Sequence, residues 1–78
     1  MKTNKKVISL ISELSGRGKL KPQDSLRDDA GLDSLSMAAL LIKIEHAFNI
    51  ELNESDMDPF DLSSVADVIS LVKRYINE

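Results

Sequence analysis

The sequence contains no cysteine, a single histidine and no tryptophan. Without cysteine there is no disulfide framework, no thiolate ligand for zinc and no cysteine nucleophile. Any thiol chemistry would therefore need a thiol supplied by another molecule. The lone histidine, His46, leaves no histidine cluster for a metal site and no histidine pair for catalysis.

Long apolar runs are also missing. The longest stretch is too short to cross a bilayer, and the N-terminus has no hydrophobic region of the kind found in signal peptides. We therefore expect a cytoplasmic protein with no membrane insertion. The 78 residues suffice for one domain, over 1–78, which we expect to be a monomer with a simple, helix-rich core.

Charge is distributed unevenly along the chain. Residues 1–23 carry six Lys/Arg and one Glu, whereas residues 24–61 carry ten Asp/Glu and two Lys/Arg. The middle of the protein should present a negative surface, which attracts basic partner faces and repels nucleic acid. The basic N-terminal stretch lacks interleaved aromatic residues, so we interpret it as a solvated helix face.

Apolar periodicity predicts an all-α fold. We expect a small four-helix bundle of three long helices and one short one. The first helix is predicted over 4–15, capped by Thr3 or Asn4 and ended by Gly16 and Gly18. A long loop over 16–33 should be anchored by Leu20, Leu26 and Leu32. The remaining helices are predicted over 34–48, over a short acidic segment at 54–60, and from Ser63 or Ser64 onward, with Ser64 and Asp67 forming a capping box.

The helix over 34–48 carries two apolar stripes. One stripe should face the core, and it comprises Met37, Leu40, Leu41, Ile44 and Phe48. The second stripe lies away from it and comprises Leu35, Ala38, Ala39 and Ile42. Two interpretations stay open at this point. The second stripe is either an exposed partner surface or a face covered by the loop over 16–33.

No set of residues is arranged for catalysis or for metal binding. Asp56, Asp58 and Asp61 suggest a calcium loop, but the central glycine and the terminal bidentate acid that such a loop needs are missing. There is no Ser/His/Asp set, no paired-acid site and no glycine-rich phosphate loop. We expect no metal site and no enzyme activity.

Ser34 stands out by its position at a loop–helix junction. A phosphate ester at a helix N-terminus would be stabilised by unpaired backbone N–H groups and by the helix dipole. The alternative is that Asp33 or Ser34 serves only as an N-cap. The tripeptide Asp24-Ser25-Leu26 repeats Asp33-Ser34-Leu35 without opening a helix, so the tripeptide alone decides nothing.

The context of the second tripeptide resembles the acyl carrier proteins. The resemblance is carried by Gly31-Leu32-Asp33-Ser34-Leu35, by the helix that ends in Phe48, and by Val65-Ala66-Asp67-Val68-Ile69. It implies that 4′-phosphopantetheine, taken from coenzyme A by a phosphopantetheinyl transferase, is attached to Ser34. It also implies that the arm carries acyl groups as thioesters.

The resemblance further implies which residues partners contact. Asp33 and Leu35 would flank the attachment site, and the partner surface would comprise Leu35, Ala38, Ile42 and Glu45. The implied partners are the transferase, an acyl-loading ligase or transferase, and synthase or condensing enzymes. Ser25, in the loop, should stay unmodified.

The sequence also departs from the fatty-acid carriers it resembles. Acids usually stand two and five residues after the serine, where this chain has Ser36 and Ala39. Our hypothesis is a dedicated carrier of a specialised, polyketide-like or amino-acid-loading pathway. The alternatives are a stand-alone aminoacyl or peptidyl carrier, whose members more often have Gly-Gly before the site, and a helical interaction module without a prosthetic group.

Overall fold

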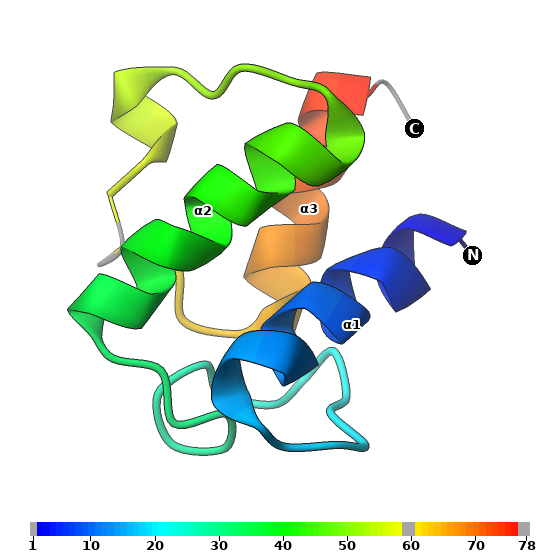
Figure 1. Ribbon diagram of the computed structural model, residues 1–78, viewed down its shortest axis with the longest axis vertical. Helices are drawn as coiled ribbons and strands as arrows, with labels where there is room; N and C mark the ends of the chain where they lie inside the picture. The colour runs from blue at the N-terminus through cyan, green and yellow to red at the C-terminus, as the bar shows by residue number, and fades with distance from the viewer. Residues whose placement is uncertain (1, 59–60, 77–78) are drawn as a thin grey trace.

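The structure, a computed structural model, describes residues 2–58 and 61–76. Within these residues the named elements are the α-helices α1 (Lys2–Ser15), α2 (Ser34–Phe48) and α3 (Val65–Ile76), and the 3₁₀ turn η1 (Glu54–Asp56). α1 packs against both α2 and α3, and η1 lies in the segment that connects α2 to α3 (Figure 1). The prediction of an all-helical fold is confirmed for the described residues.

The predicted count of four helices is not confirmed. In the described part of the short acidic helix expected over 54–60, the structure has one 3₁₀ turn, η1, in which Met57 N–H donates to the Glu54 carbonyl at 3.1 Å. A segment this short gains too few hydrogen bonds to offset the entropy of helix nucleation, so it closes a turn and stops. Pro59 and Phe60, which fell in the predicted helix, lie outside the described residues.

The start of α1 also differs from the prediction. The helix begins at Lys2, two residues earlier than expected, so Thr3 and Asn4 lie inside it and do not cap it. Thr3 is buried there. The C-terminal end is as predicted, because Gly16 adopts a left-handed φ of 72° and its N–H donates to the Ser12 carbonyl at 2.8 Å.

Residues 16–33 connect α1 to α2 and are fixed by the three predicted anchors. Leu20, Leu26 and Leu32 are all buried. Backbone hydrogen bonds join this segment to the start of α3: Leu26 N–H donates to the Ser63 carbonyl at 2.9 Å, and Val65 N–H donates to the Asp24 carbonyl at 3.0 Å. The segment is therefore tied to the core immediately before it reaches α2.

The core has two clusters of buried side chains. The larger one joins all three helices to the 16–33 segment around Ile11, Leu26, Leu40 and Val68. The smaller one is made by Leu41, Leu52 and Leu71, and it holds the segment after α2 against both α2 and α3. Burial on one side of α2 leaves its opposite side toward solvent.

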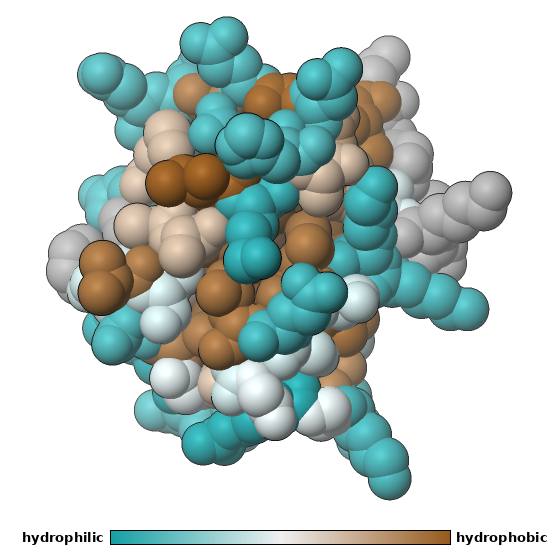
Figure 2. Space-filling model, in the orientation of Figure 1, coloured by the Kyte–Doolittle hydropathy of each residue, from teal (hydrophilic) through white to brown (hydrophobic). Residues whose placement is uncertain are grey.

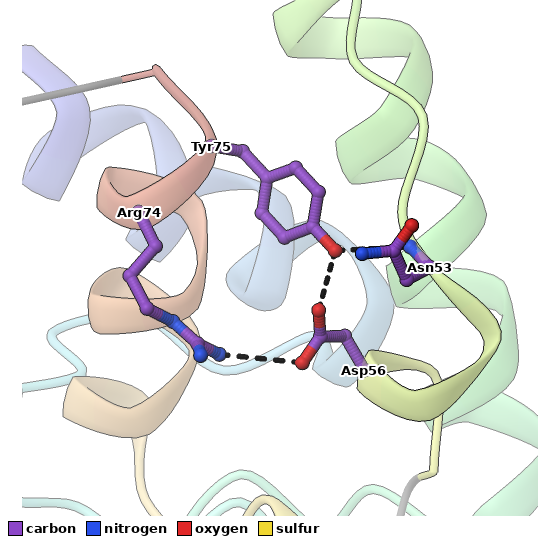
Figure 3. Close-up of polar contacts among 4 residues, drawn as sticks. All are labelled: Asn53, Asp56, Arg74 and Tyr75. Carbon is purple, nitrogen blue, oxygen red and sulfur yellow. Dashed lines mark hydrogen bonds and ion pairs between the residues drawn. The ribbon is translucent and has the colours of Figure 1, made fainter.

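A polar network connects η1 to α3. The Tyr75 hydroxyl donates to Asp56, Asn53 N–H donates to the Tyr75 oxygen at 2.9 Å, and Arg74 lies 3.4 Å from the Asp56 carboxylate (Figure 3). The Asn53 N–H acts to lower the pKa of Tyr75. The hydrogen bond to Asp56, partial burial and the nearby carboxylate charge outweigh it, so that the pKa is raised.

Replacing Tyr75 by phenylalanine should lower the free energy of unfolding, because the half-buried Asp56 loses a hydrogen-bond donor and the Asn53 N–H loses its acceptor. Chemical denaturation followed by circular dichroism measures this. Arg74→Ala is the matched comparison. Its exposed ion pair should contribute less than about 1 kcal/mol. Equal losses in the two variants would show that the phenol does not hold η1 to α3.

The N-terminus of α3 carries the predicted capping box. The Asp67 carboxylate accepts from Ser63 N–H at 2.9 Å and from Ser64 N–H at 3.0 Å, and Asp67 N–H donates to the Ser64 hydroxyl at 3.3 Å. These N–H groups, that of Ser63 foremost, lower the pKa of Asp67 below its ordinary value. The capping box therefore stabilises the charged carboxylate.

Asp67→Asn should lower the free energy of unfolding by about 1 kcal/mol near neutral pH. Because the folded-state pKa is depressed, the stabilisation is present above the ordinary pKa of about 3.8 and is lost as pH falls below it. The gap between the variant and the parent should therefore close in acid. Denaturation at several pH values tests this, with the exposed Asp28→Asn as control. A gap that stays constant with pH would contradict the assignment.

Candidate functional site

The N-terminus of α2 is built by Asp33. This residue has extended backbone angles, its Oδ1 accepts from Ser36 N–H at 2.8 Å, and its carbonyl accepts from Met37 N–H at 2.9 Å. The Ser36 N–H lowers the pKa of Asp33, so the carboxylate is charged at neutral pH. Of the two capping residues considered from the sequence, Asp33 is the N-cap.

Ser34 is the first residue of α2, and its side chain is exposed. Because Asp33 supplies the cap, the Ser34 hydroxyl is not needed to hold the helix end. In the part of the chain that the structure describes, this hydroxyl makes no hydrogen bond. It is therefore open to reaction at the positive end of the helix dipole.

Ser25, in the repeated tripeptide, is placed differently. It is half-buried and pairs with Ser64 in an isolated antiparallel bridge. Its hydroxyl accepts from Asp28 N–H at 3.1 Å, and its own N–H donates to the Asp29 carboxylate at 2.7 Å. Ser25 closes a turn in the loop, whereas Ser34 begins a helix.

One contact beside the site was not foreseen from the sequence. Gly31 has a left-handed φ of 73°, and a Cβ at this position would lie 3.3 Å from Arg17 Nη2. Arg17 Nη1 also donates to the Asp29 carbonyl at 2.8 Å. The guanidinium thus braces the turn that leads into Asp33. No sequence pattern relates Arg17 to a glycine so far along the chain.

Three of the four residues of the second apolar stripe of α2 are exposed, whereas Ala39 is half-buried. Leu35 is 80% exposed and Ile42 51% exposed, with Ala38 exposed between them. We call Leu35, Ala38 and Ile42 the α2 strip. Figure 2 shows apolar and pale side chains gathered over α2 on the left of the view. Of the two interpretations left open by the sequence, the structure supports the exposed surface, because the 16–33 segment does not cover the strip.

Glu45, the fourth residue predicted to contact partners, is half-buried at one edge of this surface. Its Oε2 accepts from Leu52 N–H at 2.9 Å, which fixes the turn after α2. The carboxylate therefore has a role within the fold. A contact between Glu45 and a partner stays a prediction.

Within residues 2–58 and 61–76, no three His, Cys, Asp or Glu side chains are grouped so that they could hold a metal ion. None of the helices described there is long and apolar enough to cross a membrane.

Comparison with known proteins places these features in a family. Residues 5–72 match the sequence profile described as the phosphopantetheine attachment site. The match spans α2, so the exposed hydroxyl of Ser34 lies inside the matched region.

Individual relatives show which family this is. The acyl carrier protein of Clostridium acetobutylicum is 32% identical over 75 residues, which cover 94% of this chain and 95% of that protein. The chain belongs to the acyl carrier protein family. A candidate mitochondrial acyl carrier protein of Schizosaccharomyces pombe is 32% identical over 69 residues, 88% of this chain but only 60% of that protein. The fold is shared with the crystal structure of a Thermotoga maritima acyl carrier protein, with a TM-score of 0.77, 18% identity, and coverage of 96% of this chain and 92% of that one.

As a member of this family, the protein is a carrier and not an enzyme, and its prosthetic group is covalently attached 4′-phosphopantetheine. Family membership also implies that it interacts with a phosphopantetheinyl transferase and with synthase enzymes. The structure offers a hydroxyl that fits such a group. Ser34 is exposed, leaves the cap to Asp33, and stands where a helix N-terminus favours a phosphate.

Proposed function

We propose that this acyl carrier protein bears its arm on Ser34 and presents acyl thioesters to partner enzymes across the α2 strip. The observation that carries the proposal is the exposed Ser34 hydroxyl at the first residue of α2, beside a helix cap that does not depend on it. Asp33 and Leu35 flank the attachment point.

The chain's own residues support a phosphodiester at this position. On attachment, Ser34 Oγ forms a bond to phosphorus and gives its proton to the transferase, while the pyrophosphate bond of coenzyme A breaks and the nucleotide leaves. The N-terminal dipole of α2 favours the resulting anion. The Asp33 carboxylate is held toward Ser36 N–H, which limits its repulsion of that charge.

The arm supplies the thiol on which acyl groups are carried. The protein has no cysteine of its own, so no side chain of the chain competes for acyl transfer. Ser34 is then a tether and not a nucleophile in acyl transfer. A loading ligase or transferase would attach the acyl chain to the arm, and condensing enzymes would use the resulting thioester as substrate.

We further propose that the carrier serves a dedicated pathway of the polyketide-like kind. The support is that Ser36 and Ala39 stand where fatty-acid carriers usually have acids, which leaves an apolar surface. An aminoacyl or peptidyl carrier is the second candidate, because the tether would be the same. Elongation of acyl chains on this carrier by a fatty-acid ketosynthase at full efficiency would contradict the dedicated role.

Because the chain lacks cysteine, a thiol count tests the carrier function directly. The protein should show no thiol after expression without a transferase. It should show one thiol per chain after incubation with coenzyme A and a broad-specificity phosphopantetheinyl transferase. Intact mass should report one added group in the same sample. If folded protein gains neither thiol nor mass, the chain is a helical interaction module and the proposal fails.

A further inference from the structure

The α2 strip runs between two segments of opposite charge. In Figure 1, α2 passes between α1 on one side and the segment after its own C-terminus on the other. The contact between α1 and α2 and the Leu41–Leu52–Leu71 cluster establish these two neighbours. The exposed side of α2 therefore borders both.

The side toward α1 is cationic. Lys43 is exposed and makes no ion pair with any described residue. One turn further along α2, the Ala47 carbonyl accepts from Lys6 Nζ of α1 at 2.9 Å, and the same ammonium lies 4.9 Å from the centre of the Phe48 ring. Two positive side chains thus border this edge, and Lys6 is held there by its contacts. Helical spacing places exposed His46 between them and the strip.

The side toward the segment after α2 is acidic. Three acids lie on this side. Glu45 of α2 accepts a hydrogen bond from Leu52 N–H, and Glu51 and Glu54 are exposed in the segment after α2. The two sides meet at a surface hollow of about 480 Å³ at the C-terminal end of α2, lined by Glu45, His46, Asn49, Ile50 and Glu51. The docking face is therefore divided, with cations on one side of an apolar strip and acids on the other.

Building on the proposed carrier function, we propose that Lys43 selects partner enzymes whose docking face is divided in the complementary way. Such a partner has an apolar socket for Leu35 and Ile42, carboxylates on the side that meets Lys43 and Lys6, and basic groups on the side that meets residues 45–54. An enzyme with a uniformly basic docking patch places like charges against Lys43, which costs affinity and slows encounter.

The division also fixes orientation. An apolar strip alone allows a partner to bind in either direction along α2, whereas opposite charges on its two sides permit one alignment. That alignment determines which way Ser34 points relative to the partner's active-site entrance. Lys43 thereby acts on the rate of delivery as well as on affinity.

The test is a double-mutant cycle with a defined probe. The probe is a fatty-acid ketosynthase with a basic docking patch, used as the parent enzyme and as a variant in which one patch arginine facing α2 is changed to glutamate. The carriers are the parent protein, Lys43→Glu, and Lys21→Glu as the matched control. Lys21 is also exposed but lies in the 16–33 segment next to Pro22, whose carbonyl accepts from Ala66 N–H of α3.

With the parent ketosynthase, Lys43→Glu should raise kcat/KM about tenfold at low ionic strength. With the glutamate variant it should lower kcat/KM by a similar factor. Both effects should fade at about 1 M salt, where the Debye length is about 3 Å. The control comparison is made at about 0.1 M salt, where the Debye length is about 10 Å. There Lys21→Glu should change either rate less than about twofold, because Lys21 lies in the 16–33 segment and not on α2, whereas Lys43→Glu should keep a clear effect because Lys43 meets the partner directly.

Responses to Lys43→Glu that are the same for both enzymes, or that Lys21→Glu reproduces, would overturn the inference. Intact mass is measured on every carrier before the assay, so a failure to load the arm counts against Ser34 and not against Lys43. A thermal melt of each carrier separates loss of the docking charge from loss of the fold.

Discussion

Replacing Ser34 by alanine is expected to abolish the attachment of 4′-phosphopantetheine. Alanine offers no oxygen to form the phosphodiester, so neither the added mass nor the new thiol should appear after incubation with coenzyme A and a transferase. The fold should survive, because α2 is capped by the Asp33 carboxylate and alanine is a strong helix former. Loss of loading in a protein with a normal circular dichroism spectrum is therefore the expected result.

The control for this variant is present in the chain itself. Ser25 stands in the same Asp-Ser-Leu tripeptide, but its hydroxyl accepts from Asp28 N–H in a turn. Ser25→Ala should load as fully as the parent protein, with a modest cost in stability of about 1 kcal/mol from the lost hydrogen bond. Loading that persists in Ser34→Ala, or that disappears in Ser25→Ala, would move the attachment site away from Ser34.

The comparison of these two serines shows how far local sequence leads. The two tripeptides are identical, and only their surroundings differ. A helix of 15 residues begins at Ser34, whereas no helix begins at Ser25, because Gly31 follows soon after it. Apolar periodicity was enough to predict α2, because it reflects burial on one side of a helix. The same periodicity identified the α2 strip, but whether the strip is covered depends on the path of residues 16–33.

What the sequence did not reveal depends on contacts between distant residues. The hydrogen bond from Arg17 to the Asp29 carbonyl, the hydrogen bond from Leu52 N–H to Glu45 and the hydrogen bond from Tyr75 to Asp56 join residues that no short motif relates. Such pairs exist only once the core has set the spacing between elements. Element ends were predicted less well for a related reason, because the first turn of α1 and the single turn of η1 depend on packing and capping rather than on a long apolar pattern.

Leu26→Ala should be the most destabilising single change considered for this protein. The side chain is fully buried where the 16–33 segment meets the three helices, and its removal leaves a cavity. Deleting a buried leucine typically costs about 2–5 kcal/mol. A small domain has a total stability near the lower end of about 5–15 kcal/mol, so a large part of it would be lost. Urea denaturation measures the difference.

Leu35→Ala is the matched control, because it makes the same chemical change on a side chain that is 80% exposed. Its free energy of unfolding should stay within about 0.5 kcal/mol of the parent protein. If the two variants lost equal stability, Leu26 would not anchor the segment before α2, and the proposed origin of the site's geometry would be wrong.

The same pair of variants separates folding from partner recognition. Leu26 N–H donates to the Ser63 carbonyl and the Leu26 carbonyl accepts from Leu32 N–H at 2.9 Å, so this residue ties the start of α3 to the residue just before Asp33. Leu26→Ala should therefore impair loading only to the extent that the protein unfolds, and conditions that restore the fold should restore loading. In Leu35→Ala the protein should stay folded. Any loss of loading or of acyl transfer in this variant should then come from the apolar contact that partner enzymes lose next to Ser34. Arm attachment thus depends on two leucines for different reasons. Leu26 holds the segment that positions Ser34, and Leu35 is the apolar side chain that partner enzymes contact beside Ser34.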